Sequence, residues 1–299
     1  MNELIVLDNQ LDFKPIIKMV VDGLQSAHSK VAYAHALEEF ANWYKSTHQQ
    51  GLSKAVIQSY KAELAASGLA ASSINVRLAA IRKLVNEASD NGFIGQDVAT
   101  AIGKVKGVKT LGVRTGNWLT KEKAQSILNN IDTSTLKGLR DKAIMAIALT
   151  CGLRRSEIAN LKTSDIQLRD ERWCIVDIKG KGGRIRTVPM VAGAKKAIND
   201  WINAAYLGGG YVFRAIRRGG HVVSGGMTAQ AVHDVIKFYS GAAPHDMRRT
   251  FAKMAHRGGA AIEQIQLTLG HSTIQTTERY LGVEQNLTSA PCDLIGILI

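Results

Sequence analysis

A glycine-rich basic stretch divides this chain of 299 residues into two parts. From Gly103 to Trp118 the sequence reads GKVKGVKTLGVRTGNW, with four glycines, four basic residues, no acidic residue and no sustained periodicity. This composition is typical of a linker, and its charge suits a path along a phosphate backbone. The chain is long enough for two domains, so we expect one domain over residues 1–103, a basic linker over 104–118 and a second domain over 119–299.

Three segments before the linker have the apolar spacing of amphipathic helices. The first begins at the candidate N-cap Ser29, and the second begins at Ser53 and stops at Gly68. The third, over residues 71–92, ends at an Asn-Gly pair. Its apolar positions fall on one face, at Ile74, Leu78, Ile81 and Val85. Short turns join the three segments, so the first domain is predicted to be a compact helical bundle.

The second domain is predicted to be mostly helical, with a small antiparallel β-sheet. One helix begins at the candidate cap Thr120, and an apolar helix ends at Gly152. Residues 172–190, RWCIVDIKGKGGRIRTVPM, combine an alternating run, a Gly-Lys-Gly-Gly turn and a second short run. This pattern predicts a β-hairpin with a flexible basic tip. The fold class is therefore mostly α, with a helical domain followed by an α+β domain.

The net charge of +13 lies entirely in the second part of the chain. Residues 1–103 hold 9 Lys and Arg against 10 Asp and Glu, whereas residues 104–299 hold 29 against 15. A basic domain indicates a polyanionic partner, most simply a nucleic acid, although a merely soluble basic protein has the same charge. Charge identifies a class of partner and not an activity.

Neither a membrane segment nor a metal motif is evident in the sequence. No run of 18 apolar residues occurs, and the acidic N-terminus lacks the pattern of a signal peptide, so we expect a soluble cytoplasmic protein with no membrane partner. Cys151, Cys174 and Cys292 lie far apart and make no metal-binding spacing with histidines. We expect these cysteines to be reduced and buried, and we expect no metal and no other cofactor.

Two arginines stand where they can bind a phosphate. Arg154, in TCGLRRSEIANL, follows Gly152 where one predicted helix stops and the next begins, and Glu157 lies one helical turn further on. Arg248, in PHDMRRTFAKMA, lies three residues after His245 and shares its helix face. A lone arginine is more often a solvated surface residue, but one that an acidic neighbour holds at a corner suits bidentate phosphate binding.

Three further residues complete the candidate site. Lys181 lies at the glycine-rich hairpin tip beside Lys179, where a lysine is usually solvated but can also reach a scissile phosphate. His271 and Tyr280 lie nine residues apart in GHSTIQTTERY. Taken alone, that stretch is equally compatible with a solvated helix that ends in an aromatic residue.

Other basic side chains are candidates for contacts with DNA phosphates. Those on the third predicted helix avoid its apolar positions, and those of the linker have no acidic residue beside them. The alternative is an ordinary solvated face. The candidates are Arg77, Arg82, Lys83, Lys104, Lys106, Lys109 and Arg114.

Together these motifs resemble those of the tyrosine recombinases, the phage integrase family. The resemblance is carried by GLRRSE, GKGGRIRTVP, HDMRRTFA, LGHSTI and TTERY, which occur in the family's order and with its usual spacings. The segments AYAHALEEFANWY and ASSINVRLAAIRKLVNEASDNGFI also resemble the helical core-binding domain of such enzymes. The resemblance spans the chain from about Lys18 to Leu281. It implies a SAM-like core-binding domain followed by an α+β catalytic domain.

The resemblance implies a site-specific DNA recombinase that cleaves and rejoins strands without a metal ion or ATP. A metal-free cleavage needs cations for the charge on the phosphoryl oxygens, a nucleophile, and an acid for the leaving oxygen. The implied catalytic residues are Arg154, Lys181, His245, Arg248, His271 and Tyr280, with Glu157 in support.

The roles of these residues follow from the same resemblance. The two arginines would clamp the non-bridging oxygens of the scissile phosphate, and His271 would hydrogen-bond it. Lys181 would protonate the departing 5′-oxygen. Tyr280 would attack to form a 3′-phosphotyrosine bond, with His245 helping to take its proton. Because the intermediate keeps the bond energy, the 5′-hydroxyl of a second strand can reverse the step without ATP.

The family's reaction also implies the partners of the chain. These are double-stranded DNA with inverted-repeat core sites and a homotetramer assembled on it, from a monomer or weak oligomer when free. The apolar C-terminal stretch CDLIGILI suits tail exchange between subunits, and docking on its own domain suits it equally. The sequence does not decide whether Tyr280 enters the pocket of its own subunit or the pocket of a neighbouring subunit.

Only about fifteen residues precede the first matching helix, which favours a simple recombinase of Xer-like or transposon type. Two rival readings share some of these features. A type IB topoisomerase has the same Arg, Lys, His and Tyr chemistry but relaxes supercoils alone. A catalytically silent DNA-binding protein would have no need of a tyrosine at that spacing.

Overall fold

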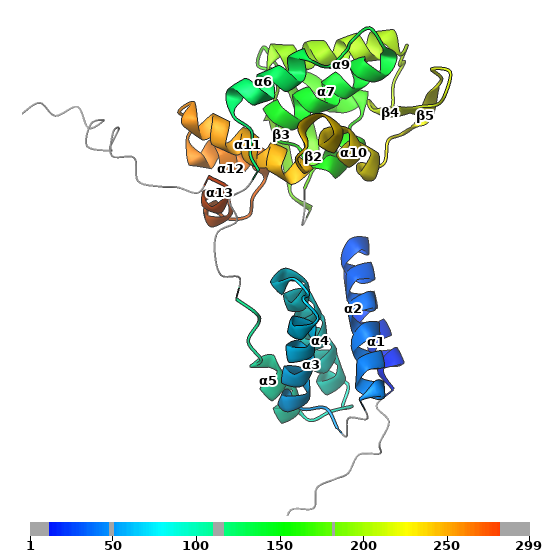
Figure 1. Ribbon diagram of the computed structural model, residues 1–299, viewed down its shortest axis with the longest axis vertical. Coiled ribbons are helices and arrows are strands. Elements are labelled where there is room, and N and C mark those ends of the chain that lie inside the picture. The colour runs from blue at the N-terminus through cyan, green and yellow to red at the C-terminus, as the bar shows by residue number, and fades with distance from the viewer. Residues whose placement is uncertain (1–11, 48–50, 110–116, 181–182, 282–299) are drawn as a thin grey trace, which may run out of the picture. The chain divides into compact units, whose positions relative to one another are not determined.

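The computed structural model of the protein describes residues 12–47, 51–109, 117–180 and 183–281. The chain divides into two compact units, Met1–Val113 and Arg114–Ile299 (Figure 1). The first unit is helical and the second combines helices with two small antiparallel sheets, which confirms the predicted fold class. In the described parts of the chain, no helix is both long enough and apolar enough to cross a membrane.

Amphipathic helices build the first unit around one apolar core. Ile74, Leu78, Ile81 and Val85 are all buried in it, as their spacing predicts. The unit also contains a first and a fifth helix that were not predicted, although Phe13, Ile16 and Val20 of the first have helical spacing and are buried. Its helices are α1 (Phe13–Asp22), α2 (Ala27–Ser46), α3 (Lys54–Ala66), α4 (Ala71–Asp90) and α5 (Gln96–Gly103).

Of the two N-caps predicted for the first unit, one is correct and one is wrong. Ser53 caps α3, where its hydroxyl accepts a hydrogen bond from the Val56 N–H. For α2 the cap is Ser26 and not Ser29, so the helix begins three residues earlier than predicted. Ser26 has an extended backbone, and its hydroxyl accepts from the Ser29 N–H. Both serines are followed by helix-forming residues, so spacing alone did not distinguish them.

The beginning of the predicted linker packs against α4. Val105 is buried in the core of the first unit, and the Arg82 guanidinium donates to its carbonyl. The Asn75 side chain forms two hydrogen bonds with the Val108 backbone. Its Oδ1 accepts from the Val108 N–H at 2.8 Å, and its Nδ2 donates to the Val108 carbonyl at 3.0 Å. Side chains of α4 therefore hold residues 105–108 in place.

The second unit is organised around α7, most of whose side chains are buried. Thr120 caps α6 as predicted, and Gly152 follows α7 with a φ of +58°, a left-handed conformation that glycine adopts without strain. The helices are α6 (Lys121–Asn129), α7 (Leu136–Thr150), α8 (Arg155–Ala159), α9 (Ala192–Ala204), α10 (Ala229–Ser240), α11 (Pro244–Arg257), α12 (Ile262–Leu269) and α13 (Ile274–Leu281), with a 3₁₀ turn at Thr163–Asp165.

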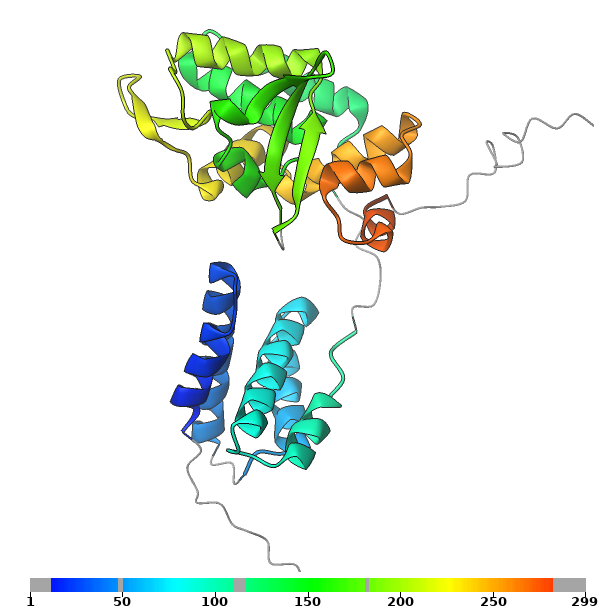
Figure 2. The ribbon, with the colours of Figure 1, turned by 180° about the vertical axis from the view of Figure 1, so that it is seen from behind.

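A three-stranded antiparallel sheet packs on the same core (Figure 2). It consists of β1 (Ile166–Arg169), β2 (Arg172–Lys179) and β3 (Ile185–Pro189), in that order. The predicted hairpin is confirmed, since β2 and β3 pair up to Lys179 and Ile185. Neither β1 nor a separate hairpin of β4 (Arg214–Ile216) and β5 (Val222–Gly226) was predicted.

The regular alternation expected for β2 is broken by a bulge. The register shifts between Ile175 and Ile178, and Asp177 between them has a φ of +53°. As a result Cys174, Ile175 and Val176 are buried in succession. Such a bulge bends a strand and re-aims the residues that follow it, here those leading to the hairpin tip. Cys174 and Cys151 are free and buried, as predicted, whereas Cys292 lies outside the described residues.

A buried ion pair holds α7 to its neighbours. The Asp141 carboxylate is fully buried and accepts bonds from Arg140 at 2.7 Å, from Lys137 at 2.8 Å and from the Tyr239 hydroxyl at 3.3 Å. The Arg140 guanidinium also donates to the Arg214 carbonyl of β4. The ion pair therefore links three elements of the fold, α7, α10 and β4.

Replacing Asp141 with alanine is expected to lower the free energy of unfolding by about 3–5 kcal/mol, because it leaves the Arg140 charge buried and unpaired. Urea unfolding followed by circular dichroism measures the loss. The matched control is Asp200→Ala, which removes an exposed pair with Lys196 and should cost less than about 1 kcal/mol. Equal losses in the two variants would contradict this account of the buried pair.

Candidate active site

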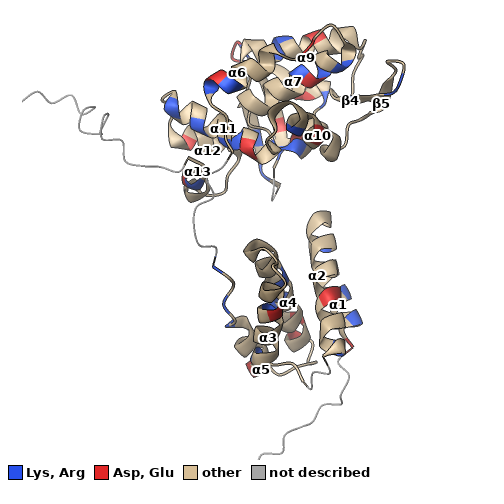
Figure 3. Ribbon diagram, in the orientation of Figure 1, with Lys and Arg blue, Asp and Glu red and all other residues tan. Residues whose placement is uncertain are grey.

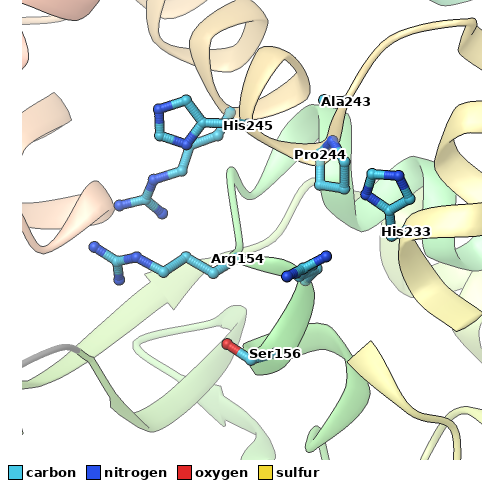
Figure 4. Close-up of a pocket in the computed structure, with 8 residues that line it drawn as sticks. Arg154, Ser156, His233, Ala243, Pro244 and His245 are labelled. Carbon is cyan, nitrogen blue, oxygen red and sulfur yellow. The ribbon is translucent and has the colours of Figure 1, made fainter. Parts of the chain in front are cut away.

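The candidate site lies where α7 ends and where α8 and α11 begin. Arg154 precedes α8, and His245 and Arg248 lie on the first turn and a half of α11. Arg154 and His245 extend toward the same side of a pocket (Figure 4). The pocket has a volume of about 340 Å³. Its lining residues are Arg154, Arg155, Ser156, His233, Ala243, Pro244, His245 and Arg248.

Glu157 fixes Arg154 at the corner, as the sequence predicts. One Glu157 carboxylate oxygen accepts from the Arg154 backbone N–H at 2.8 Å, and the other accepts from its guanidinium at 2.8 Å. Burial acts to raise the pKa of Glu157, but hydrogen bonds and charge from Arg186, together with the bonds from Arg154, outweigh it. The pKa therefore lies below its ordinary value. Glu157 stays ionised and keeps its arginine partners.

Arg248 is almost entirely buried, with 2% of its surface exposed. Its two terminal nitrogens donate to the carbonyls of Gly152 and Leu269, which joins the end of α7 to the end of α12. Its Nε atom is buried without a hydrogen-bond partner among the described residues. Burial first, and then the Arg154 charge, lower the pKa of Arg248 to about 10, so it is still a cation at neutral pH.

The tyrosine and the two predicted histidines form one cluster. The Tyr280 hydroxyl and His245 Nε2 share a hydrogen bond of 2.8 Å. The His271 ring lies edge-on to the Tyr280 ring, with centroids 4.7 Å apart, and its Nδ1 shares a hydrogen bond of 3.0 Å with Thr277. The Arg249 guanidinium lies 5.5 Å from the centre of the Tyr280 ring. His271, Thr277 and Tyr280 of GHSTIQTTERY therefore pack into one cluster, whereas most of the residues between them are exposed.

Both histidines are held neutral by their surroundings. Burial, followed by the charges of Arg249 and Arg248, lowers the pKa of His245, and Asp246 acts in the opposite sense. Burial, followed by the charges of Arg248 and Arg154, lowers the pKa of His271 to about 4. A neutral imidazole can accept a proton, so His245 can take one from the hydroxyl it contacts.

The low pKa of His271 predicts acid sensitivity. In the unfolded chain a histidine binds its proton near pH 6.5, but in the folded protein His271 does so only near pH 4. Between these values the unfolded state binds more protons, so the stability present above pH 6.5 decreases as the pH falls toward 4. We expect a contribution of roughly 1–3 kcal/mol.

Urea unfolding at pH 7.5 and pH 5 measures this dependence, with His271→Gln as the variant. The variant should lose less stability between the two pH values than the unchanged protein does. His256→Gln is the control, because His256 is exposed on α11. An unchanged pH dependence in His271→Gln would show that another group causes the acid sensitivity.

The structure brings five of the six predicted catalytic residues into one region, around α8, α11 and α13. The sixth, Lys181, lies outside the described residues, between the ends of β2 and β3. The charged or ionisable residues that the prediction omitted include Arg186 on Glu157, Arg249 on Tyr280, and His233 in the pocket. The motifs that contain Arg186 and Arg249 were recognised, but only contacts in space distinguish these arginines from their neighbours.

The three predicted DNA-contact residues on α4 have protein partners. Arg77 pairs with Glu39 and has 16% of its side chain exposed, Arg82 bonds the Val105 carbonyl, and Lys83 pairs with Glu87. Lys104, Lys106 and Lys109 are exposed, and Arg114 lies outside the described residues. A role in DNA binding stays a prediction for all seven.

The second unit has a basic surface element that the sequence analysis missed. Residues 201–233 contain no Asp or Glu, and Figure 3 shows basic residues on the β4–β5 hairpin. Arg217 and Arg218 lie between β4 and β5 and are exposed. The long interval without acidic residues is a signal that the sequence already contained. Among the described residues, no group of three or more His, Cys, Asp or Glu side chains is placed to hold a metal ion.

Comparison with known proteins identifies relatives of both units. Residues 117–286 match the phage integrase family, and residues 20–92 match the phage integrase N-terminal SAM-like domain. The tyrosine recombinase XerC of Chromobacterium violaceum is 26% identical over 263 residues, which cover 87% of this chain and 86% of that protein. XerC of Myxococcus xanthus is 34% identical over 179 residues, which cover 55% of this chain and 57% of its own.

Solved structures share the fold at lower identity. The Tn1549 transposon integrase in complex with circular intermediate DNA has a TM-score of 0.67 at 17% identity, covering 95% of this chain and 99% of that one. The XerH recombinase in a post-cleavage complex with a palindromic difH substrate has a TM-score of 0.68 at 18% identity. The match covers 91% of this chain and 80% of that one.

Proposed function

Because the chain belongs to the phage integrase family, whose members are tyrosine-type site-specific recombinases, we propose that Tyr280 is its nucleophile. In this proposal the enzyme cleaves and rejoins DNA strands through a 3′-phosphotyrosine intermediate and exchanges strands between two duplexes. The observation that carries the proposal is the 2.8 Å hydrogen bond between the Tyr280 hydroxyl and His245, beside a pocket lined by Arg154 and Arg248. The hydroxyl, a base and two cations are then within reach of one phosphate.

In the cleavage step, the Tyr280 oxygen forms a bond to phosphorus as the bond to the 5′-oxygen breaks. The phenolic proton passes to His245, whose lowered pKa keeps it neutral beforehand. The leaving oxygen takes a proton from Lys181, a role that rests on the family resemblance. In the reverse step a 5′-hydroxyl attacks the phosphotyrosine and tyrosine regains its proton, so no external energy source is consumed.

The two arginines support the step in different ways. Arg248 is held rigidly by its two carbonyl partners and lines the pocket. Arg154 is more exposed and lines the pocket wall. Preorganised donors of this kind stabilise the charge that develops on the phosphoryl oxygens. We assign His271 to the same phosphate, next to Tyr280.

The proposed partners follow from the family. The substrate is double-stranded DNA with inverted-repeat core sites, acted on in the cytoplasm by a homotetramer that assembles on it. The free protein is a monomer or weak oligomer. The C-terminal tail, including Cys292, lies outside the described residues, so its exchange between subunits and its docking on its own domain both stay predictions. The exposed Arg217 and Arg218 are added to the candidates for phosphate contacts.

Strand transfer between two duplexes tests the proposal. Duplexes that bind the protein are first selected from a random pool, which also yields the target sequence. A selected duplex with a nick near the cleavage position should give an SDS-resistant protein–DNA adduct. Adding a second duplex with the same site should then join strands from the two molecules.

The rival readings predict different products in the same assay. A type IB topoisomerase would form the adduct and relax a supercoiled plasmid that lacks the selected site, without joining two duplexes. A catalytically silent DNA-binding protein would form only a non-covalent complex, which SDS dissociates. Either result would reject the proposed recombinase activity.

A further inference from the structure

Arg186 on β3 binds the carboxylate that positions Arg154. Its two terminal nitrogens donate to the two oxygens of Glu157, at 2.7 and 3.0 Å, in a bidentate pair. Only 8% of the Arg186 side chain and 6% of the Glu157 side chain are exposed. A bidentate arginine–carboxylate pair buried to this degree is strong and geometrically fixed.

The Arg186 pair limits what Glu157 can do with Arg154. Each Glu157 oxygen already accepts one bond from Arg186, and each accepts one more from Arg154, one from the backbone N–H and one from a single terminal nitrogen. Four bonds fill the capacity of a carboxylate. Glu157 therefore cannot form a second, bidentate pair with Arg154, and most of the Arg154 guanidinium stays available at the pocket, with 31% of its side chain exposed.

Arg186 also reaches the loop that carries His271. Its Nε donates to the Thr268 carbonyl at 2.7 Å, at the end of α12. Gly270 has a φ of +63°, and a Cβ atom there would come within 2.9 Å of the Arg186 side chain. The arginine thus packs against the residue before His271. One side chain of the hairpin strand β3 contacts both the Arg154 corner and the His271 loop.

We propose that Arg186 is a positioning residue, which occupies Glu157 bidentately so that Arg154 remains available to the scissile phosphate. It has no contact with the reacting atoms in this role. It sets how Glu157 divides its hydrogen bonds between two arginines, and it fixes β3 against the end of α12. The inference rests on the proposed function for the identity of the phosphate, but the arrangement of the three side chains is independent of it.

Removing Arg186 has a specific expected consequence. In Arg186→Gln the Glu157 carboxylate loses its bidentate partner and turns to the nearest guanidinium, that of Arg154. Arg154 is then withdrawn from the pocket. In the double variant Glu157→Gln/Arg186→Gln the charge that withdraws Arg154 is also absent, so Arg154 becomes available again. A purely structural role predicts that the double variant is no better than the single one.

Chemical modification tests the arrangement without any DNA. Phenylglyoxal reacts with accessible guanidinium groups, and mass spectrometry gives the reaction rate at Arg154, with exposed Arg257 of the same protein as the internal reference. We expect Arg186→Gln to lower the Arg154 rate at least fivefold and the double variant to restore it to within about twofold of the unchanged protein. Arg184→Gln, which removes an exposed arginine beside β3, is the control and should leave the rate unchanged.

Adduct formation on a saturating nicked duplex supplies the functional measurement. Arg186→Gln should slow single-turnover adduct formation on the order of 10²-fold with a Kd for DNA within about threefold, and the double variant should regain at least tenfold. An unchanged Arg154 rate in Arg186→Gln, or a double variant no more reactive than the single one, would overturn the inference. Failure of the unchanged protein to form an adduct would instead reject the proposed function, and the phenylglyoxal result would still decide the role of Arg186.

Discussion

Replacing Tyr280 with phenylalanine is expected to abolish the covalent protein–DNA adduct and leave DNA binding intact. The substitution removes only the hydroxyl that forms the 2.8 Å bond to His245. The ring keeps its contacts with His271 and Arg249, so the site should retain its shape. Loss of a nucleophile reduces a covalent reaction by a factor on the order of 10⁴ or more.

Single-turnover incubation with a nicked duplex, followed by SDS gel electrophoresis, measures the adduct, and a gel shift at the same concentrations measures binding. The matched control is Tyr206→Phe, because Tyr206 is 93% exposed and lies outside the site. It should form the adduct as fast as the unchanged protein. An adduct that persists in Tyr280→Phe would show that another residue is the nucleophile.

Replacing Arg248 with lysine is expected to slow cleavage by about 10²–10³-fold, although the positive charge is kept. Lysine cannot donate to the Gly152 and Leu269 carbonyls while also directing a donor at the phosphate, as the planar guanidinium can. The ends of α7 and α12 would then be held less firmly. A buried carbonyl left without its donor costs about 1–3 kcal/mol, so stability should fall as well.

Two measurements separate the effects of this variant on catalysis and on folding. Single-turnover cleavage on saturating DNA, at a temperature where circular dichroism shows the variant folded, gives the catalytic loss. The control is Arg257→Lys, at the exposed end of the same helix, which should change neither quantity. A cleavage rate within threefold of the unchanged protein would contradict the assignment of Arg248 to the phosphate.

The sequence predicted the elements whose signals are local. Apolar spacing located α4, and the glycine after α7 marked the corner at Arg154. The pairing of β2 and β3 followed from an alternating run and its turn. The shortest strands were missed, because β1, β4 and β5 have only three to five residues, too few to show a period. The first helix was missed although its signal was present, since Phe13, Ile16 and Val20 have helical spacing.

The candidate site shows the same division between local and spatial information. His245 and Arg248 share a helix, so their relation was visible in the spacing. Contacts between distant segments were not, and the pair of Arg186 with Glu157 joins residues 29 positions apart. The sequence alone does not distinguish an arginine that binds a ligand from one that pairs with a carboxylate, because the difference lies in contacts between distant segments.

The cluster of arginines around one carboxylate links the stability of the protein to its substrate. Arg154, Arg186 and Arg248 share Glu157 as their nearby acid, and this unbalanced charge favours any state in which an anion is bound. By mass action, a ligand at 100 times its Kd that binds only the folded state adds about 2.7 kcal/mol to the free energy of unfolding. DNA would thus act as a folding ligand as well as a substrate. The enzyme would be most resistant to heat and proteolysis while engaged on its site, and easiest to remove once it has released the rejoined strands.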